Sequence, residues 1–184
     1  QLYPASVTKI MSLLLVMEAI ESGKMTLDME ITCSESAAEK GGSQIWLKEG
    51  EQMTVDDLLK STAVYSANDA CTALAEYVSG SEDAFVQKMN ERAKELGALN
   101  SNFVNPNGLP DENHYTTAYD LAMIGKAFFA DETLCKITLS PLLQIASSEY
   151  QPGIRIAKAK DNWVLLGNIS QAAANGEWAE VTLD

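Results

Sequence analysis

The 184-residue sequence predicts an α+β fold. Two observations lead to this prediction. Apolar residues recur at helical spacing, with capping residues before them, over much of the first 140 positions, and short segments of alternating or β-rich residues follow from about position 150. Helices in one run and strands in another are typical of α+β proteins rather than of proteins that alternate the two. With 46% apolar and 21% charged residues, the chain has the composition of a globular domain that can bury a sizeable core.

The first predicted helix covers residues 5–22 and ends at Gly23, which supplies a C-terminal stop. Further apolar residues fill much of its remaining circumference, so we expect it to be buried on most sides. Glu18 interrupts the apolar run, which therefore falls short of the ~20 residues that a membrane-spanning helix needs. Its main apolar face consists of Ile10, Leu13, Leu14, Met17 and Ile20, and Met11, Leu15 and Val16 extend it.

The next segments predict a strand, a loop and two helices. Alternation in "MTLDMEITC" (25–33) predicts a strand with Leu27, Met29 and Ile31 on one face. The glycine-containing stretch 40–53 is expected to be a hairpin or loop. Thr54 and Asp57 form a capping signature for a helix over 55–65, and a further helix is expected over 69–78.

The second half predicts further helices, then strands. Residues 81–97 have the most regular helical spacing, and the Asn-, Pro- and Gly-rich stretch 102–115 must be a loop. Thr117 and Asp120 cap the next helix, and Asp131 opens a short helix before Pro141. The expected helix after the loop covers 118–130, and the expected strands cover 154–159, 162–167 and 178–183.

Charge and cysteine content exclude some classes of function. The net charge of −13 argues against nucleic-acid binding, which needs clustered Lys and Arg to neutralise phosphates. A charge of this size is accounted for by solubility alone. Three widely separated cysteines and a single His make a structural zinc site improbable. The odd number argues against a full disulfide framework, so we expect buried thiols at Cys33, Cys71 and Cys135.

"YPASVTKIM" (3–11) places a serine and a lysine three residues apart at the start of the first helix. That spacing brings the Ser6 hydroxyl and the Lys9 amine to one helix face. A serine hydroxyl needs an adjacent base to become a nucleophile, and a lysine held neutral by burial can be that base. The structural alternative is an N-terminal capping serine beside a lysine whose amine reaches solvent.

"YSANDA" (65–70) lies at the junction of two predicted helices. A short S-x-N turn can present a hydroxyl and a carboxamide into a cleft, where Ser66 could relay a proton and Asn68 could hold a substrate amide. The alternative is a helix N-cap, for which Ser, Asn and Asp are all preferred.

An S-x-x-K motif followed some sixty residues later by S-x-N is found in penicillin-binding proteins and class A β-lactamases. With "NPNGLPDENHYTTAYDLA" (105–122), the sequence resembles the low-molecular-mass penicillin-binding proteins, the D-alanyl-D-alanine carboxypeptidases of peptidase family S11. The resemblance spans about residues 2–140. It implies a β-lactamase/transpeptidase-like α+β fold, a helical cluster packed on an antiparallel sheet, and the sheet looks incomplete in this chain.

The resemblance also implies roles for individual residues. Ser6 matches the acylated nucleophile and Lys9 the base that takes its proton, while Ser66 and Asn68 match the second motif, with Ala67 where relatives often have Gly. His114 lies in the segment that matches a loop flanking the cleft. It is a candidate substrate contact, with an ordinary exposed loop histidine as the alternative.

The family's third motif, K-T-G on a strand beside the active site, is missing. No K-T-G, K-S-G or H-T-G triplet occurs in the 184 residues. In the family this strand helps to bind the substrate carboxylate and completes the oxyanion hole, whose loss can lower the rate on the order of 10²–10³-fold. Either the sequence is a fragment without that strand, or its ending has diverged and the protein only binds.

The resemblance implies a serine-type D-Ala-D-Ala carboxypeptidase that acts on peptidoglycan stem peptides through an acyl-enzyme and is acylated by β-lactams. Neither a metal nor an organic cofactor is expected. Two alternatives stay open: a serine β-lactamase, against which the 105–122 segment argues, and a non-catalytic peptidoglycan-binding or scaffolding protein.

The expected organisation is a partial catalytic region over 1–140 and a short β-rich tail of uncertain origin over 141–184. Because peptidoglycan lies outside the cytoplasmic membrane, the parent protein is expected to be exported. Family members often carry a C-terminal membrane-associating segment, and none is visible in this sequence.

Overall fold

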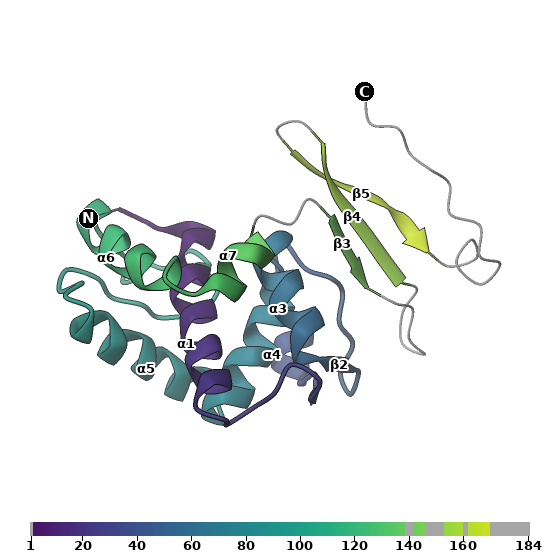
Figure 1. Cartoon of the computed structure of the whole chain (residues 1–184), viewed down its shortest axis with the longest axis horizontal. Helices are drawn as coiled ribbons and strands as arrows, with labels where there is room; N and C mark the ends of the chain where they lie inside the picture. The colour runs from purple at the N-terminus through teal and green to yellow at the C-terminus, as the bar shows by residue number, and fades with distance from the viewer. Residues whose placement is uncertain (1, 139–141, 146–152, 160–161, 170–184) are drawn as a thin grey trace.

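The structure is a computed structural model that describes residues 2–138, 142–145, 153–159 and 162–169. In this part of the chain, seven α-helices and a 3₁₀ turn form a cluster with one of the helices at its centre. Two small antiparallel sheets accompany the cluster (Figure 1). The expected α+β class is confirmed. The elements are η1 Ala5–Thr8, α1 Lys9–Glu21, β1 Glu30–Thr32, α2 Glu35–Ala38, β2 Gln52–Thr54, α3 Val55–Val64, α4 Asn68–Ser79, α5 Glu82–Glu95, α6 Ala118–Phe128, α7 Glu132–Thr138, β3 Leu142–Ile145, β4 Gly153–Ala159 and β5 Asn162–Ile169.

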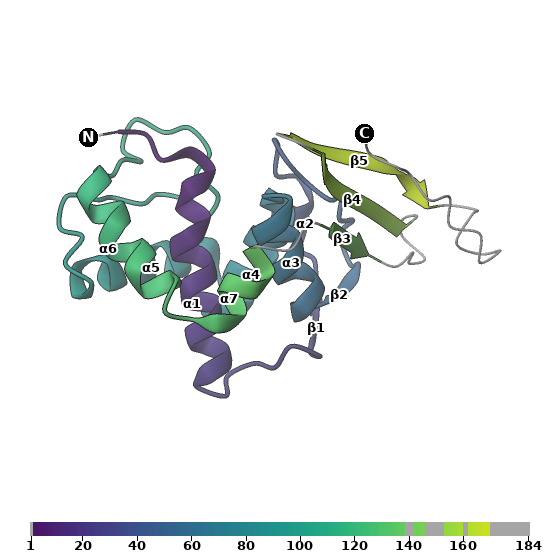
Figure 2. The ribbon, with the colours of Figure 1, turned by 45° about the horizontal axis from the view of Figure 1, so that its top comes forward.

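Helix α1 is the centre of the helical cluster. It contacts α3, α4, α5, α6 and α7, and both ribbon views show it between the other helices (Figures 1 and 2). Burial on most sides is therefore confirmed: Met11, Val16 and Met17, from different sides of the helix, are all buried. The first turn of the expected helix is instead a 3₁₀ turn, η1, which follows the buried Pro4.

Helices α3 and α6 begin where their capping residues predict, and α5 begins at a further cap, Ser81. The side-chain oxygens of Thr54, Ser81 and Thr117 accept hydrogen bonds from the backbone N–H groups three residues further on, at the starts of α3, α5 and α6. Each of these bonds satisfies a donor that the helix itself leaves free. Helix α7 begins after Asp131, whose Oδ1 accepts from the N–H groups of Thr133 and Leu134.

The strand predicted over 25–33 is wrong for most of its length. Only β1 is extended, and it pairs antiparallel with β2, Ile31 opposite Met53. Before it, the N–H of Met29 donates to the carbonyl of Thr26, and the Thr26 hydroxyl donates to Asp28 at 2.6 Å. This local turn replaces the alternation, and it leaves Leu27 exposed instead of on a buried face.

The second sheet has the order β3-β4-β5, and all its pairs are antiparallel. Strands β4 and β5 confirm two of the three expected strands, while the third, over 178–183, lies outside the described residues. Strand β3 was not expected. It contacts α3 and so joins this sheet to the helical cluster.

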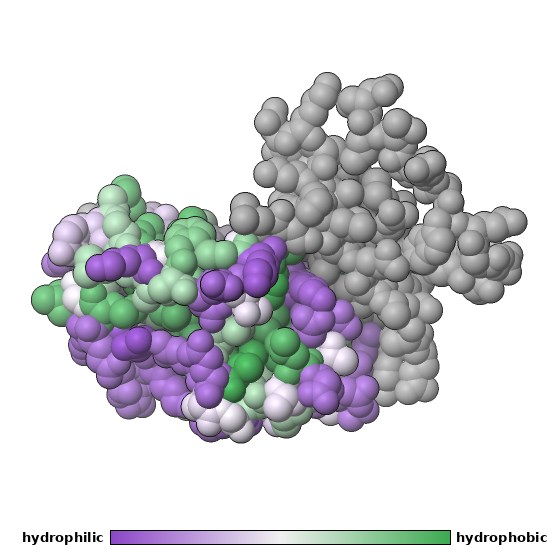
Figure 3. Space-filling model, viewed as in Figure 1, coloured by the Kyte–Doolittle hydropathy of each residue, from purple (hydrophilic) through white to green (hydrophobic). Residues whose placement is uncertain are grey.

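Apolar residues also reach the surface near the N-terminus. Leu2 and Val7 there, and Phe129 at the C-terminal end of α6, are large apolar side chains that remain exposed. Figure 3 shows hydrophobic areas on the face that carries the N-terminal segment and α6. No helix within the described ranges is long and apolar enough to cross a membrane.

Candidate active site

Ser6 and Lys9 lie one above the other because Ser6 is within the 3₁₀ turn η1 and Lys9 directly follows it. With three residues per turn, side chains at positions i and i+3 are eclipsed. Lys9 Nζ donates to Ser6 Oγ at 3.3 Å, and Ser6 is exposed whereas Lys9 is 3% exposed. The capping alternative is wrong, since Ser6 lies inside the turn after an N-cap at Pro4 and the Lys9 amine is turned inward. The result is an accessible hydroxyl directly above a buried amine.

Three oxygens surround the Lys9 amine. Besides contacting Ser6, Nζ donates to Oδ1 of Asn68 at 2.7 Å and to the backbone carbonyl of Asn107 at 2.8 Å. Burial lowers the pKa of Lys9 from its ordinary value of 10.5, and the nearby Cys71 opposes that shift. Desolvation disfavours the charged ammonium form. A larger fraction of Lys9 is therefore neutral, and able to accept a proton, than of a surface lysine at the same pH.

Ser66, at the junction of α3 and α4, lines a groove together with Ser6 and Lys9. The groove has a volume of about 390 Å³. Ser66 Oγ is buried without a hydrogen-bond partner in the described part of the chain, and its backbone has a φ of 64°. A non-glycine residue in this conformation is strained, and such strain is often found at functional sites.

The helix-cap alternative for "SAN" is also wrong. The N-cap of α4 is Ala67, and no side chain caps the helix there. Asn68 uses Oδ1 to accept from Lys9 and Nδ2 to donate to the carbonyl of Gly41 at 2.7 Å. Its substrate contact therefore remains a prediction, and what the geometry gives directly is an amide that orients the lysine.

The loop 105–109 closes the site from a third side. Oδ1 of Asn105 accepts from the N–H groups of Asn107, Gly108 and Leu109, which folds the loop on itself. A Cβ at Gly108, whose φ is 82°, would lie 1.8 Å from the carbonyl oxygen of Ala5. Only glycine permits this approach, so the loop rests directly on the residue before Ser6.

His114 was considered as an exposed loop histidine or a substrate contact, and the first alternative is wrong because it is 2% exposed. Its Nε2 lies 2.8 Å from Thr8 Oγ1 and its Nδ1 accepts from the N–H of Val104 at 3.2 Å. Burial lowers its pKa, with Asp111 acting in the opposite direction. The ring nitrogens thus hold the loop to η1, and a substrate contact stays a prediction.

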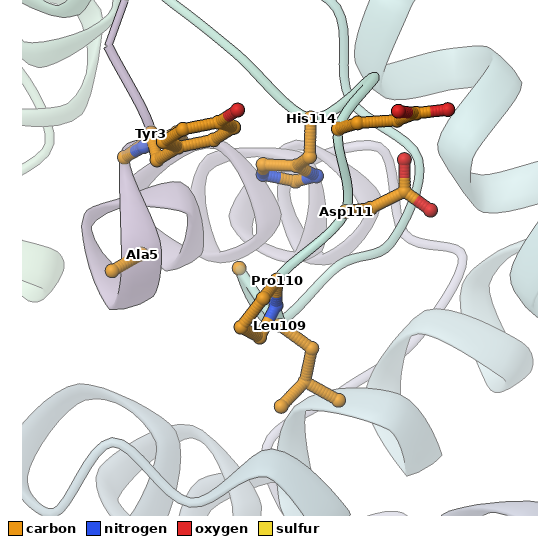
Figure 4. Close-up of a pocket in the computed structure, with 9 residues that line it drawn as sticks. Tyr3, Ala5, Leu109, Pro110, Asp111 and His114 are labelled. Carbon is orange, nitrogen blue, oxygen red and sulfur yellow. The ribbon is translucent and has the colours of Figure 1, made fainter.

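A second pocket, of about 500 Å³, lies beside the Ser6 turn and is lined by His114. Figure 4 shows Tyr3, His114 and Pro110 around this pocket, with the Asp111 carboxylate on the side away from Ala5. The pocket and the groove share no lining residue, although consecutive residues line them, Ala5 the pocket and Ser6 the groove.

Acidic, histidine and cysteine side chains are the usual protein ligands of metal ions. No group of three or more His, Cys, Asp or Glu residues within the described ranges could hold a metal ion. Cys33 and Cys71 are buried free thiols, as expected, whereas Cys135 is only partly buried. Burial is the main cause that raises the pKa values of Cys33 and Cys71 to about 12.

Sequence reasoning missed Asn107, Thr8 and Asp69. Asn107 acts through its backbone carbonyl, which no residue-type pattern can indicate. Thr8 could have been found, because it stands between Ser6 and Lys9 inside the motif. Asp69 follows Asn68 directly, and its carboxylate is 0% exposed.

Comparisons with known proteins identify the family of the chain. The family model described as Peptidase_S11, D-alanyl-D-alanine carboxypeptidase, matches residues 1–158. D-alanyl-D-alanine carboxypeptidase DacF of Bacillus subtilis (strain 168) is 51% identical over 138 residues, which are 75% of this chain and 36% of that protein. DacC of Escherichia coli (strain K12) is 41% identical over 137 residues, 71% of this chain and 34% of that protein. The chain thus spans about a third of the length of these curated relatives.

Solved structures show the same fold. D-alanyl-D-alanine carboxypeptidase DacD from Francisella tularensis matches with a TM-score of 0.77 and 32% identity, covering 90% of this chain and 49% of that one. Penicillin binding protein 5 from Haemophilus influenzae matches with a TM-score of 0.75 and 27% identity, covering 94% and 60%. The expected penicillin-binding-protein type of fold is confirmed.

Proposed function

The chain belongs to the peptidase S11 family of D-alanyl-D-alanine carboxypeptidases, and from that membership we propose that its site performs serine acyl transfer on peptidoglycan stem peptides ending in D-Ala-D-Ala. The observation that carries the proposal is the buried Lys9 amine under the exposed Ser6 hydroxyl. Because this substrate lies outside the cytoplasmic membrane, the parent protein acts there.

The first step is formation of the acyl-enzyme. Lys9 accepts the Ser6 proton as Oγ attacks the carbonyl carbon of the penultimate D-alanine. The bond to the terminal D-alanine then breaks, and its nitrogen leaves with a proton returned through Lys9 or the Ser66 hydroxyl. Ser66 suits this role because it lines the groove with Ser6 and Lys9 and its Oγ has no partner among the described residues.

The second step releases the product. Water attacks the ester carbonyl, the Ser6 Oγ bond breaks and Ser6 recovers a proton, so the enzyme returns to its starting state. A β-lactam presents a strained amide to the same hydroxyl, and opening of its ring gives an adduct in which no leaving group departs. The adduct therefore adds the full mass of the β-lactam to the chain.

Intact mass after incubation with benzylpenicillin tests the proposal. We expect one adduct on the parent chain and on Ser22→Ala, a control at the exposed C-terminal end of α1. Ser6→Ala should show none, and Lys9→Met should form it on the order of 10²–10⁴-fold more slowly. No adduct on a folded parent chain would contradict acyl transfer, as would an adduct that persists in Ser6→Ala.

A second candidate function is binding of peptidoglycan without turnover. It is favoured by the absence of a K-T-G, K-S-G or H-T-G triplet from the 184 residues. Equilibrium binding of a D-Ala-D-Ala peptide, measured by calorimetry on the parent chain, separates the two. Binding without adduct formation or release of D-alanine supports this second function and contradicts the first.

A further inference from the structure

Asp69, the second residue of α4, has a buried carboxylate that the acyl-transfer steps do not use. It is 0% exposed and accepts from three backbone N–H groups, those of Ile45, Leu47 and Ala70, at 2.9–3.2 Å. Burial raises the pKa of Asp69, and these N–H groups act against that shift. Two of the three donors belong to residues 41–47, which we name the 41–47 loop.

The 41–47 loop is held in a strained conformation. Trp46 has a φ of 61°, which is unfavourable for a bulky side chain, and it remains 40% exposed. Its neighbours Ile45 and Leu47 are buried, and the backbone N–H of each donates to the Asp69 carboxylate. The carboxylate therefore stabilises the backbone on both sides of the strained residue.

The same loop holds the amide that orients Lys9. The backbone N–H of Asn68 donates to the carbonyl of Ser43, and its Nδ2 donates to the carbonyl of Gly41, both at 2.7 Å. The other side of that amide accepts from Lys9. Hydrogen bonds at both ends of the 41–47 loop, joined by its backbone, thus connect Asp69 through Asn68 to the Lys9 amine.

We propose that Asp69 is a positioning residue for acyl transfer: its carboxylate fixes the 41–47 loop, and the loop fixes the Asn68 amide that keeps Lys9 buried under Ser6. The proposal rests on the proposed function for its consequence in catalysis. The effect of Asp69 on the environment of Lys9 can be measured even if the protein has no enzymatic activity.

The test compares Asp69→Asn with Asp120→Asn. Both aspartates are 0% exposed, lie in the first turn of a helix and accept a backbone N–H from a preceding loop. In Asp69→Asn the new NH₂ group faces backbone donors, so the loop loses acceptors and water gains access to Lys9. Asp120 accepts hydrogen bonds from the Asn100 N–H and the Ser101 hydroxyl, and among the described residues neither Asn68 nor Lys9 is one of its hydrogen-bond partners.

The readout is the pKa of Lys9, obtained from the pH dependence of acetylation by acetic anhydride and peptide mass spectrometry. Among the described residues, Cys71 on α4 is the titratable group whose charge acts on Lys9, and its pKa of about 12 keeps it neutral through most of the scan. We expect the pKa of Lys9 to rise toward 10.5 in Asp69→Asn and to stay at the parent value in Asp120→Asn. An unchanged pKa in folded Asp69→Asn overturns the proposal.

Two glycines give a second comparison if Asp69→Asn does not fold. A Cβ at Gly42, whose φ is 83°, would lie 2.7 Å from Asn68 Nδ2, whereas a Cβ at Gly41 would meet nothing within 4 Å. Gly42→Ala should therefore displace the Asn68 amide and raise the pKa of Lys9, and Gly41→Ala should not. Equal values in these two variants also overturn the proposal.

The rate of acylation by a fluorescent penicillin then tests whether the environment of Lys9 affects the reaction. We expect acylation of Asp69→Asn to be on the order of tenfold slower at neutral pH, because a smaller fraction of Lys9 is then neutral, with little change in the dependence on penicillin concentration. A parent chain that is not acylated contradicts the proposed function, while the Lys9 titration still decides the role of Asp69.

Discussion

Nε2 of His114 lies 2.8 Å from Oγ1 of Thr8, although 106 residues separate them in the chain. Because Nδ1 accepts the N–H of Val104, the proton of the neutral ring is on Nε2, which donates to Thr8. Phe103 packs edge-on against the ring, 5.7 Å between centroids. The turn that carries Ser6 and Lys9 is thereby tied to the loop that supplies the Asn107 carbonyl.

This relationship predicts a loss of stability in mild acid. Protonation of Nδ1 would oppose the Val104 N–H, and burial holds the pKa of folded His114 below its ordinary value of 6.5. As the pH falls below about 6.5, the unfolded chain binds the proton first, so the free energy of unfolding decreases until folded His114 is protonated too. Urea unfolding between about pH 5 and 8 measures this.

His114→Gln is the control, since it should lose the part of the pH dependence between 6.5 and the lowered pKa. His114 is the single histidine of the sequence, so its imidazole signals in proton NMR are assigned without ambiguity. An NMR titration with an inflection at or above 6.5 would contradict the prediction.

Ser66→Ala should separate stability from activity. The substitution removes a buried hydroxyl that has no partner among the described residues, so we expect the melting temperature to stay the same or rise. Acylation by benzylpenicillin should fall on the order of 10²-fold or more if the hydroxyl relays a proton. A lower melting temperature with unchanged acylation would show that the hydroxyl is structural.

Gly108→Ala should destabilise the protein and slow acylation together. The added Cβ would lie 1.8 Å from the Ala5 carbonyl and 2.9 Å from Thr8 Oγ1, so the 105–109 loop must move off the Ser6 turn. We expect a loss of more than about 1 kcal/mol in the free energy of unfolding, measured in urea.

Gly125→Ala is the matched control for Gly108→Ala. It lies inside α6, where a Cβ would meet nothing within 4 Å, and should stabilise the helix by roughly 0.5–1 kcal/mol. Equal effects of the two substitutions would refute the close approach of Gly108 to Ala5.

Cysteine labelling should distinguish the three thiols. Iodoacetamide reacts with thiolates, and burial raises the pKa values of Cys33 and Cys71 to about 12. At about pH 8 the folded chain should therefore be alkylated at the partly exposed Cys135, and the other two should react only after unfolding in urea. Peptide mass spectrometry identifies the site, and early modification of Cys71 would show that the interior behind Lys9 is open.

The helices could be predicted from the sequence because their signals are local. Thr54, Ser81 and Thr117 each stand three residues before the N–H group that they accept, so capping is visible in a short window of sequence. The prediction failed at 25–33, where alternation indicates a strand but the Thr26–Asp28 hydrogen bond closes a turn. Alternation alone cannot distinguish the two, because the pairing that would stabilise a strand comes from β2, more than twenty residues later.

The candidate nucleophile and base could be identified from the sequence by itself, because Ser6 and Lys9 belong to one turn of chain. Whether Lys9 can act as a base depends on its burial, and that was decided only by the tertiary structure. The oxygens that surround its amine come from Asn68 and Asn107, 59 and 98 residues away. Desolvation is a property of everything packed around a group, so no local pattern of residues can specify it.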